Sequence, residues 1–246
     1  MSGGRTLNIL VAGGSSPSGI AVARALRGAG HAVFTVGSDA GRIAAAADEA
    51  GNGVVPLACD LAAPAAVRDL RATLTEQAGR VDGVIHLVGG WRGAKGITDQ
   101  SDEDWDFLER NAVTTLRNVS RTFYDDLAAS DTGRLAIVSS TAVASPTAGG
   151  ASYAAAKAAA ETWTLAVADG FRRAQSGSTG PGTDAGEQRS AAAIFVVKAL
   201  VDAAMRAKSP ERKFPGFTDV EELAAAAVGL FRTPAAELNG RRLPLS

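Results

Sequence analysis

Short apolar runs alternate along the chain with longer stretches in which apolar residues recur at helical spacing. The first five runs are almost continuously apolar, which is typical of parallel strands buried on both faces of a sheet. The alternation favours a doubly wound α/β domain, with a parallel sheet of about seven strands and helices on both faces. The predicted strands are residues 7–12, 32–36, 54–58, 84–88, 135–139, 193–197 and 242–245. The predicted helices are residues 18–27, 42–50, 65–78, 103–129, 152–173 and 219–231, the last with Thr218 as its N-cap.

Two segments depart from this alternation. Residues 174–190 are rich in Gly, Ser, Thr and Pro and have no hydrophobic period, so we expect an exposed, mobile loop there. The sixth predicted strand leads directly into Lys198-Ala199-Leu200, which indicates that a helix starts at once. The chain has 246 residues, of which 46% are hydrophobic, and this is enough for one large core. We therefore expect a single domain over residues 1–246.

Composition excludes several classes of protein. The net charge is -1 and no long run carries one sign, so we expect neither a nucleic-acid partner nor an acidic tail. The single cysteine, Cys59, excludes an intramolecular disulfide and fits a reducing compartment. The first apolar run is too short for a signal peptide, and no stretch approaches the ~20 apolar residues that span a bilayer. We therefore expect a soluble cytoplasmic protein, without a membrane partner and without a bound metal.

The turn after the first predicted strand is rich in glycine. Residues 12–19 read Ala-Gly-Gly-Ser-Ser-Pro-Ser-Gly and lead into a predicted helix. Glycines allow the backbone to turn sharply and to approach a pyrophosphate, and the helix N-terminus offers free N–H groups and a favourable dipole. A plain glycine-rich turn is the alternative, but the position between the first strand and a helix favours phosphate binding.

Four polar side chains in the second half of the chain have catalytic potential. Tyr153 and Lys157 are four residues apart in an alanine-rich predicted helix, so both side chains project from one face. A free tyrosine has a pKa of about 10, and a lysine ammonium within ~4–6 Å lowers it toward the range useful for proton transfer. Ser140 follows the fifth predicted strand, and Asn111 lies in the long predicted helix. An ordinary buried tyrosine and serine are the alternative, but the chain has only two tyrosines, which makes a chance pairing rare.

Together these motifs resemble those of the short-chain dehydrogenase/reductase family, and the resemblance covers nearly the whole chain. It implies a Rossmann-like fold and hydride transfer between C4 of a nicotinamide and a substrate carbon. It also implies that Tyr153 donates or accepts the proton, that Lys157 binds the nicotinamide ribose, and that Ser140 stabilises the substrate oxygen. Asn111 would hold a water that relays protons to Lys157.

The glycine motif of the family is only partly present. It falls on Gly13, Pro17 and Gly19, so that proline replaces the middle glycine. Pro17 has no N–H to donate, but proline suits the first position of a helix. We therefore expect the turn to form, with the hydroxyls of Ser15 and Ser16 helping to hold phosphate.

The end of the second strand bears on the choice of cofactor, because an acid there favours NAD and a basic residue favours NADP. The acid position of the family is Gly37 and its basic position is Ser38, so neither signal is present. Arg42 is close enough in sequence to contribute. Together with the missing acid it favours NADP, whereas Asp39 argues for NAD.

Further cofactor contacts are implied after the third and fourth strands. Asp60 and Leu61 match a position that contacts adenine in the family, although an aspartate there is also a common turn former. Of the family's Asn-Asn-Ala-Gly only Gly89 remains, and His86 is interpreted as a structural histidine bonded to a neighbouring backbone group. The expected cofactor contacts are Gly13, Ser15, Ser16, Gly19, Ser38, Arg42, Asp60, Leu61, Gly89, Tyr153 and Lys157.

The expected function is that of an NAD(P)-dependent oxidoreductase that interconverts a small carbonyl compound and its alcohol. A catalytically silent dinucleotide-binding regulator is the alternative, favoured by Pro17, by residues 86–88 and by Lys198 where the family has Pro-Gly. An epimerase or dehydratase that uses the same Tyr and Lys is a third interpretation, for which the chain is short. The resemblance also implies a substrate-covering segment at residues 199–217, and a homodimer or homotetramer formed through the long helix and its neighbour.

Overall fold

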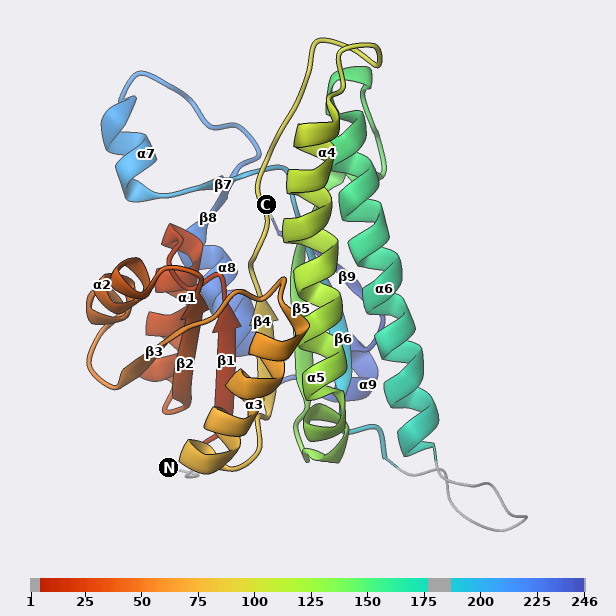
Figure 1. Ribbon diagram of the computed structural model, residues 1–246. Coiled ribbons are helices and arrows are strands. Elements are labelled where there is room, and N and C mark those ends of the chain that lie inside the picture. The colour runs from red at the N-terminus through yellow and green to blue at the C-terminus, as the bar shows by residue number, and fades with distance from the viewer. Residues whose placement is uncertain (1–4, 177–186, 246) are drawn as a thin grey trace.

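A seven-stranded parallel sheet forms the centre of the protein (Figure 1). The computed structural model describes residues 5–176 and 187–245. The strand order is β3-β2-β1-β4-β5-β6-β9, and every neighbouring pair is parallel. The doubly wound class and all seven predicted strands are therefore confirmed. The strands are β1 (Asn8–Ala12), β2 (Ala32–Gly37), β3 (Val54–Ala58), β4 (Gly83–His86), β5 (Arg134–Ser140), β6 (Ala191–Val197) and β9 (Arg242–Pro244).

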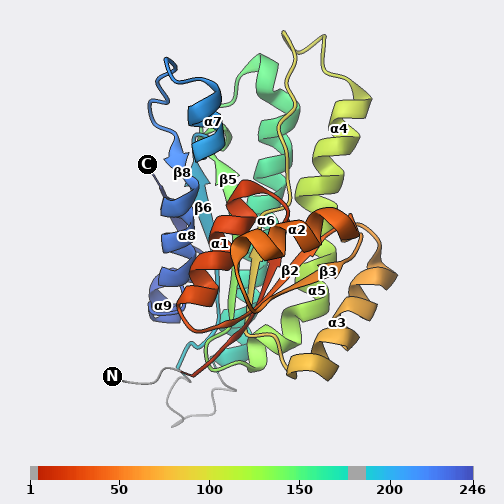
Figure 2. The same cartoon turned by 90° about the vertical axis from the view of Figure 1, so that its left-hand side faces the viewer.

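Helices cover both faces of this sheet (Figures 1 and 2). In β1, Ile9 and Val11 pack against one layer of helices, and Leu10 and Ala12 pack against the other. Because successive side chains of a strand point to opposite faces, such a strand must be apolar throughout. Among residues 5–176 and 187–245, no helix is both long enough and apolar enough to cross a bilayer. One layer holds α1 (Pro17–Gly28), α2 (Ala40–Ala50) and α8 (Val220–Gly229), and the other holds α3 (Pro64–Ala78), α5 (Thr115–Ala129) and α6 (Ala151–Gln175).

The long helix predicted over residues 103–129 is not regular throughout. Helix α4 (Asp102–Glu109) passes into a π-helical turn, Arg110–Thr114, which continues into α5. A π-turn accommodates an extra residue without ending the helix, so the apolar pattern on either side still reads as one helix. Such turns change the direction of the side chains they carry. Here the π-turn carries Asn111, one of the expected site residues.

The segment after β6 does not enter a helix at once, so that prediction was wrong. Leu200–Val201 form a short strand, β7, and α7 (Ala203–Lys208) begins after it. Strand β7 pairs in parallel with β8 (Thr218–Asp219), which lies after α7 in the chain. The pairing joins residues far apart in the sequence, which a local pattern cannot reveal. The N-cap of α8 is Asp219 and not the expected Thr218, because the Asp219 side chain accepts a hydrogen bond from the N–H of Glu221 at 3.0 Å.

The predicted loop over residues 174–190 begins later than expected. Helix α6 continues to Gln175, so the first residues of that range are helical. The Gln175 side-chain oxygen accepts hydrogen bonds from the N–H groups of Arg189 and Ser190, both at 2.9 Å, which joins the end of α6 to the start of β6. Residues 177–186, the centre of the predicted loop, lie outside the described residues. A short helix that was not predicted, α9 (Ala235–Leu238), precedes β9.

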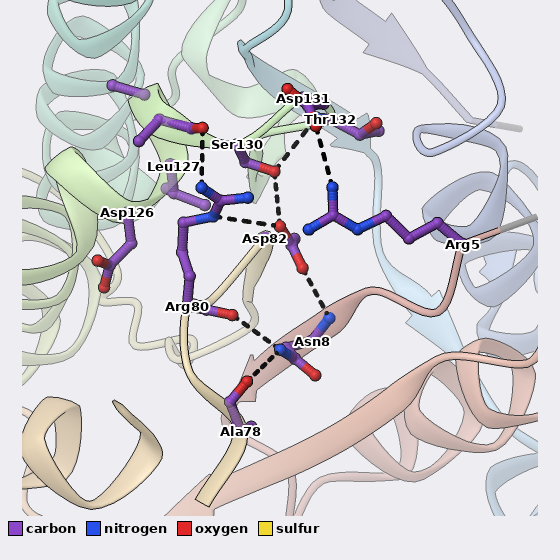
Figure 3. A network of polar contacts seen from close by, with 12 residues as sticks. Arg5, Asn8, Ala78, Arg80, Asp82, Asp126, Leu127, Ser130, Asp131 and Thr132 are labelled. Atoms are coloured by element: carbon purple, nitrogen blue, oxygen red, sulfur yellow. Dashed lines mark hydrogen bonds and ion pairs between the residues drawn. The ribbon is translucent and has the colours of Figure 1, made fainter. Parts of the chain in front are cut away.

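A polar network closes the amino-terminal ends of the strands (Figure 3). Asp82, just before β4, is buried and accepts hydrogen bonds from the Asn8 N–H at 3.0 Å and from the Ser130 hydroxyl at 2.6 Å. The Asn8 side chain in turn donates to the carbonyl of Ala78 at 2.8 Å. These bonds tie β1, β4 and the turn before β5 together. The amino-terminal ends of the strands are thus held by structural contacts, and the candidate site lies at their carboxyl ends.

Candidate active site

Two adjoining cavities open at the carboxyl ends of the strands, around the point where the strand order reverses between β1 and β4. In open α/β sheets, ligands bind at this reversal point. The first cavity has a volume of about 1000 Å³ and the second about 640 Å³. Both are lined by Leu87 and Gly89, which follow β4, so the two cavities form neighbouring parts of one site.

Three of the four expected catalytic residues line the first cavity. Ser140 ends β5, and Tyr153 and Lys157 lie in the first turns of α6. The Ser140 side chain hydrogen-bonds Tyr153, and its oxygen also accepts a bond from the N–H of Ala142 at 3.1 Å. The Lys157 ammonium lies 6.0 Å from the centre of the Tyr153 ring and donates to the Val138 carbonyl at 2.8 Å. The i, i+4 spacing thus places both side chains on the wall of the cavity that Ser140 also lines.

Burial dominates the proton affinities of this pair. It raises the pKa of Tyr153 above its usual value, and the hydrogen bond with Ser140 works in the opposite direction. It lowers the pKa of Lys157 to about 8, against the attraction of the Glu161 carboxylate. The expected lowering of the tyrosine pKa by Lys157 is therefore not found, because removal of the phenol from water has the larger effect.

Asn111 lies apart from these three residues, on the wall of the second cavity. Its side chain donates to the carbonyl of Phe107 at 2.8 Å, and its own carbonyl accepts a bond from the Thr115 hydroxyl at 2.7 Å. The Thr115 oxygen also lies 3.0 Å from Nε2 of the buried His86, on β4. His86 is thus hydrogen-bonded within the protein, to the Thr115 side chain and, as expected, to the backbone. Burial, and then Lys157, lower its pKa to about 3, so the ring is neutral at physiological pH.

Glu161 is a part of the site that sequence reasoning missed. It lies one turn after Lys157 on α6 and is only 6% exposed. Its carboxylate accepts a hydrogen bond from the Ser139 hydroxyl at 2.6 Å and pairs with the guanidinium of Arg242, on β9, at 3.0 Å. The signal was present, because Tyr153, Lys157 and Glu161 follow one another at four-residue intervals and so share a helix face.

The glycine-rich turn forms as expected, with proline at the start of the helix. Ser16 is the N-cap of α1, its side chain accepts a bond from the N–H of Gly19 at 3.0 Å, and Pro17 occupies the first helical position. A Cβ on Gly19 would lie 2.5 Å from the Gly13 carbonyl oxygen, so only glycine allows this close approach. Gly19 lines neither cavity and packs against the backbone of Gly13 within the turn, whereas Gly13 and Ser16 line the second cavity.

At the end of β2, glycine stands where the family has an acid, and the Ser15 side chain lies beside it. A Cβ on Gly37 would lie only 2.6 Å from the Ser15 Oγ, so the serine side chain occupies the space that a side chain at this position would need. Ser38 and Arg42 line the second cavity, and Arg42 is exposed. Asp39 caps α2 by accepting a bond from the N–H of Arg42 at 2.8 Å, which gives this acid a structural role.

Asp60 and Leu61 lie on the opposite wall of the second cavity. One Asp60 oxygen accepts a bond from the N–H of Ala62 at 2.9 Å, as a turn former does, and the other pairs with Arg110 of the π-turn at 2.8 Å. Together with Gly13, Ser15, Ser16, Ser38, Arg42 and Gly89, they form a continuous lining of expected cofactor contacts. Within the part of the chain that the structure describes, no three His, Cys, Asp or Glu side chains gather as around a metal ion.

A doubly wound sheet with a glycine-rich turn after β1 and a Ser-Tyr-Lys set beside it defines the class of Rossmann-like dinucleotide-binding domains with a candidate catalytic cavity. The model of the short chain dehydrogenase family matches residues 7–175, and the chain belongs to the short-chain dehydrogenase/reductase family. It is 28% identical over 157 residues to the NADP-dependent 3-hydroxy acid dehydrogenase YdfG of Salmonella typhi, a match of 64% of this chain and 63% of that protein. A probable NADP-dependent dehydrogenase of Haemophilus influenzae is 27% identical over 161 residues, 65% of this chain and 64% of that one. The chain thus matches less than two thirds of the length of either relative.

Solved structures show the same fold over almost the whole chain. A short chain oxidoreductase of Pseudomonas aeruginosa PAO1, described as containing an atypical catalytic center, superimposes with a TM-score of 0.82 at 18% identity and covers 98% of this chain and 95% of its own. Its NADPH-bound form gives a TM-score of 0.81 at 18% identity, with 99% and 97% covered. An NAD+-bound xylitol dehydrogenase gives 0.79 at 17% identity, with 97% and 96% covered.

Proposed function

We propose that the protein is an NAD(P)-dependent oxidoreductase that interconverts a small carbonyl compound and its alcohol. The observation that carries this proposal is the convergence of Ser140, Tyr153 and Lys157 on the wall of a cavity of about 1000 Å³. That cavity adjoins a second one lined by the expected dinucleotide contacts. The family membership and the NADP-dependent relatives support the same reaction class.

The residues of the second cavity fit a nicotinamide dinucleotide. Gly13 has a φ of +83°, and a Cβ there would lie 3.0 Å from the backbone of Leu87, so this turn needs glycine to pack against the segment after β4. The turn lies at the N-terminus of α1, whose dipole favours phosphate. Ser38 and Arg42 would meet the adenosine ribose, and Lys157 the nicotinamide ribose. When bound, the dinucleotide supplies or accepts the hydride.

The side chains of the first cavity then handle the proton. In the reducing direction the Tyr153 hydroxyl donates its proton to the substrate oxygen, to which the Ser140 hydroxyl donates a hydrogen bond. The Lys157 ammonium stabilises the tyrosinate that remains. Glu161 favours the charged form of Lys157, which burial alone would disfavour. Asn111, in the π-turn, would hold the water through which a proton returns to Lys157.

Replacement of Tyr153 by phenylalanine tests this reaction. We expect turnover of a carbonyl compound to fall about 10²–10⁴-fold, the usual contribution of a positioned acid–base group, with NADPH affinity close to that of the wild type. Tyr124→Phe, at the other tyrosine of the chain, is the matched control and should retain turnover. A silent dinucleotide-binding regulator would bind NADPH but have no turnover to lose. Failure to bind NADPH or NADH at millimolar concentration would overturn the proposal.

NADP is the preferred cofactor in this proposal. Arg42 lines the second cavity, no acid occupies position 37, and two relatives are named as NADP-dependent. A charged hydrogen bond to the 2′-phosphate contributes about 1.5–3 kcal/mol, so Arg42→Ala should raise the Kd of NADPH by about tenfold or more and leave NADH binding unchanged. Arg68→Ala, at an exposed arginine outside this cavity, is the control. An equal effect on both dinucleotides would contradict the assignment.

The proposal includes a homodimer or homotetramer formed through α5 and α6. A groove of about 420 Å³ between these helices is lined by Tyr124, Trp163, Val167 and Gly170, which supports a contact surface there. Light scattering coupled to size-exclusion chromatography measures the mass directly. A monomer at the concentrations used for turnover assays would contradict this part of the proposal.

A further inference from the structure

The first cavity contains a second positive charge besides Lys157. Among the described residues that line it, Lys198 is the remaining charged one, and no Asp, Glu or Arg side chain contributes to its walls. Lys157 is engaged by the Val138 carbonyl and by its proposed catalytic role. The lining thus carries two ammonium groups and no acid, while the Glu161 carboxylate behind Lys157 is already paired with Arg242, and such a wall favours anions.

The position of Lys198 relates it to the reacting atoms. Strands β5 and β6 are in register so that Val197 is paired with Ser140. Neighbouring strands lie about 4.8 Å apart, so Lys198 leaves the sheet one residue beyond the neighbour of Ser140. Its flexible four-carbon stem allows the ammonium to reach a group beside the oxygen that Ser140 would bind.

The Lys198 ammonium is also available to a ligand. Its Nζ donates to the carbonyl of Pro215 at 3.1 Å and lies 5.9 Å from the centre of the Phe217 ring. Neither partner is a carboxylate, and an ammonium group has three N–H donors. The contrast is Arg206 in the same segment, whose guanidinium is paired with Asp219 at 3.2 Å. An anion could therefore bind the exposed Lys198 without breaking an ion pair.

We propose that Lys198 binds an anionic group of the substrate, so that the carbonyl compound is a keto acid or a keto phosphate. This assignment rests on the proposed oxidoreductase function. Carboxylate and phosphate both offer the charged acceptor oxygens that shorten and strengthen a hydrogen bond from an ammonium. The hydroxyls of Thr141 and Ser145, which line the same cavity, provide further neutral donors. Lys198 thus selects the substrate by charge, while Ser140 and Tyr153 act on its carbonyl oxygen.

Pairs of compounds that differ chiefly in charge test this role through NADPH oxidation. Acetoacetate with methyl acetoacetate probes the carboxylate, and dihydroxyacetone phosphate with dihydroxyacetone probes the phosphate. We expect the wild type to favour the charged member of one pair. Lys198→Met should raise KM for that member about 10- to 100-fold without changing kcat/KM for the neutral one, and Lys198→Arg should retain most of the preference. Lys213→Met, at an exposed lysine of the same segment outside the cavity, should have no effect.

Calorimetric titration of each compound into the NADP-saturated protein separates this inference from the proposed function. Charge-selective binding that is lost in Lys198→Met, without turnover of any compound, would support Lys198 and overturn the reductase. Turnover without preference for either charged compound, or an equal effect of Lys198→Met on both members of a pair, would overturn the role of Lys198 alone. A rise in the Kd of NADPH in Lys198→Met would assign this residue to the cofactor, and would also overturn it. No charge preference in either binding or turnover has the same consequence.

Discussion

Replacement of Glu161 by glutamine should lower the pH at which activity is lost on the alkaline side. Glu161 is buried one turn after Lys157. Burial lowers the pKa of Lys157 to about 8, and the Glu161 carboxylate opposes this lowering. In the proposed reaction the Lys157 ammonium stabilises the tyrosinate, so activity should fall as the pH rises through this pKa. Removal of the carboxylate leaves burial unopposed, and the ammonium then loses its proton at a lower pH.

The size of the effect follows from the helix geometry. Side chains at i and i+4 have their Cβ atoms about 5–6 Å apart, and unit charges at about 6 Å interact by about 2.8 kcal/mol at an effective dielectric of about 20. This energy corresponds to about two pH units. The Arg242 guanidinium lies 3.0 Å from the same carboxylate and opposes its effect on Lys157. We therefore expect Glu161→Gln to move the alkaline limb by about one pH unit.

The other titratable groups that face Lys157 do not obscure this limb. The pKa of His86 is lowered to about 3, so this ring stays neutral throughout, and the pKa of Tyr153 is raised above its usual value, so the phenol ionises later. The profile of kcat/KM from about pH 6 to about pH 10 reports the free enzyme. Arg242→Met is the opposing control, because it frees Glu161 to act on Lys157 and should move the limb upward. Limbs that coincide in all three proteins would refute the reasoning.

Three further changes test the turn, the buried histidine and a buried arginine. Gly19→Ala should abolish NADPH binding in a titration, because its Cβ would lie 2.5 Å from the Gly13 oxygen. In urea denaturation, the unfolding free energy of the wild type should fall by about 1.4 kcal/mol for each pH unit below about 6.5. The reason is that the His86 ring binds a proton there in the unfolded state, whereas in the folded state its pKa is about 3. In His86→Gln this dependence on pH should be absent. Arg134→Met should cost about 3 kcal/mol or more in the same assay, because the buried guanidinium donates to four backbone carbonyls, including that of Leu230 at 2.8 Å.

Features that depend on neighbouring residues could be predicted from the sequence. A strand buried on both faces is apolar at every position, so all seven strands of the sheet were found. The Tyr153 and Lys157 pair needs only a helix between its members, and the first position of α1 needs only Pro17. Each of these depends on local geometry that the order of residues specifies directly.

Features that depend on distant residues could not be predicted from the sequence. Strand β7 exists because it pairs with β8, some eighteen residues later, and its own two residues carry no recognisable pattern. The π-turn was not predicted because the segments on either side of it each have helical spacing and no breaking residue separates them. The polar partners of the site are also non-local: Thr115 bonds His86 from α5, and Arg242 reaches Glu161 from β9.

The departures from the family's motifs are related to one another through this structure. A side chain at Gly37 would require the Ser15 hydroxyl to rotate away, because a Cβ there would lie 2.6 Å from its Oγ. Pro17 replaces a glycine of the family at the first helical position, next to the Ser16 cap that bonds the first turn of α1. The two departures, at Gly37 and at Pro17, thus both adjoin the serines of this turn. In the proposed function, the exposed Arg42 would meet the adenosine end of the cofactor, with Asp39, at 3.8 Å from its guanidinium, as the neighbouring acid in place of one at position 37.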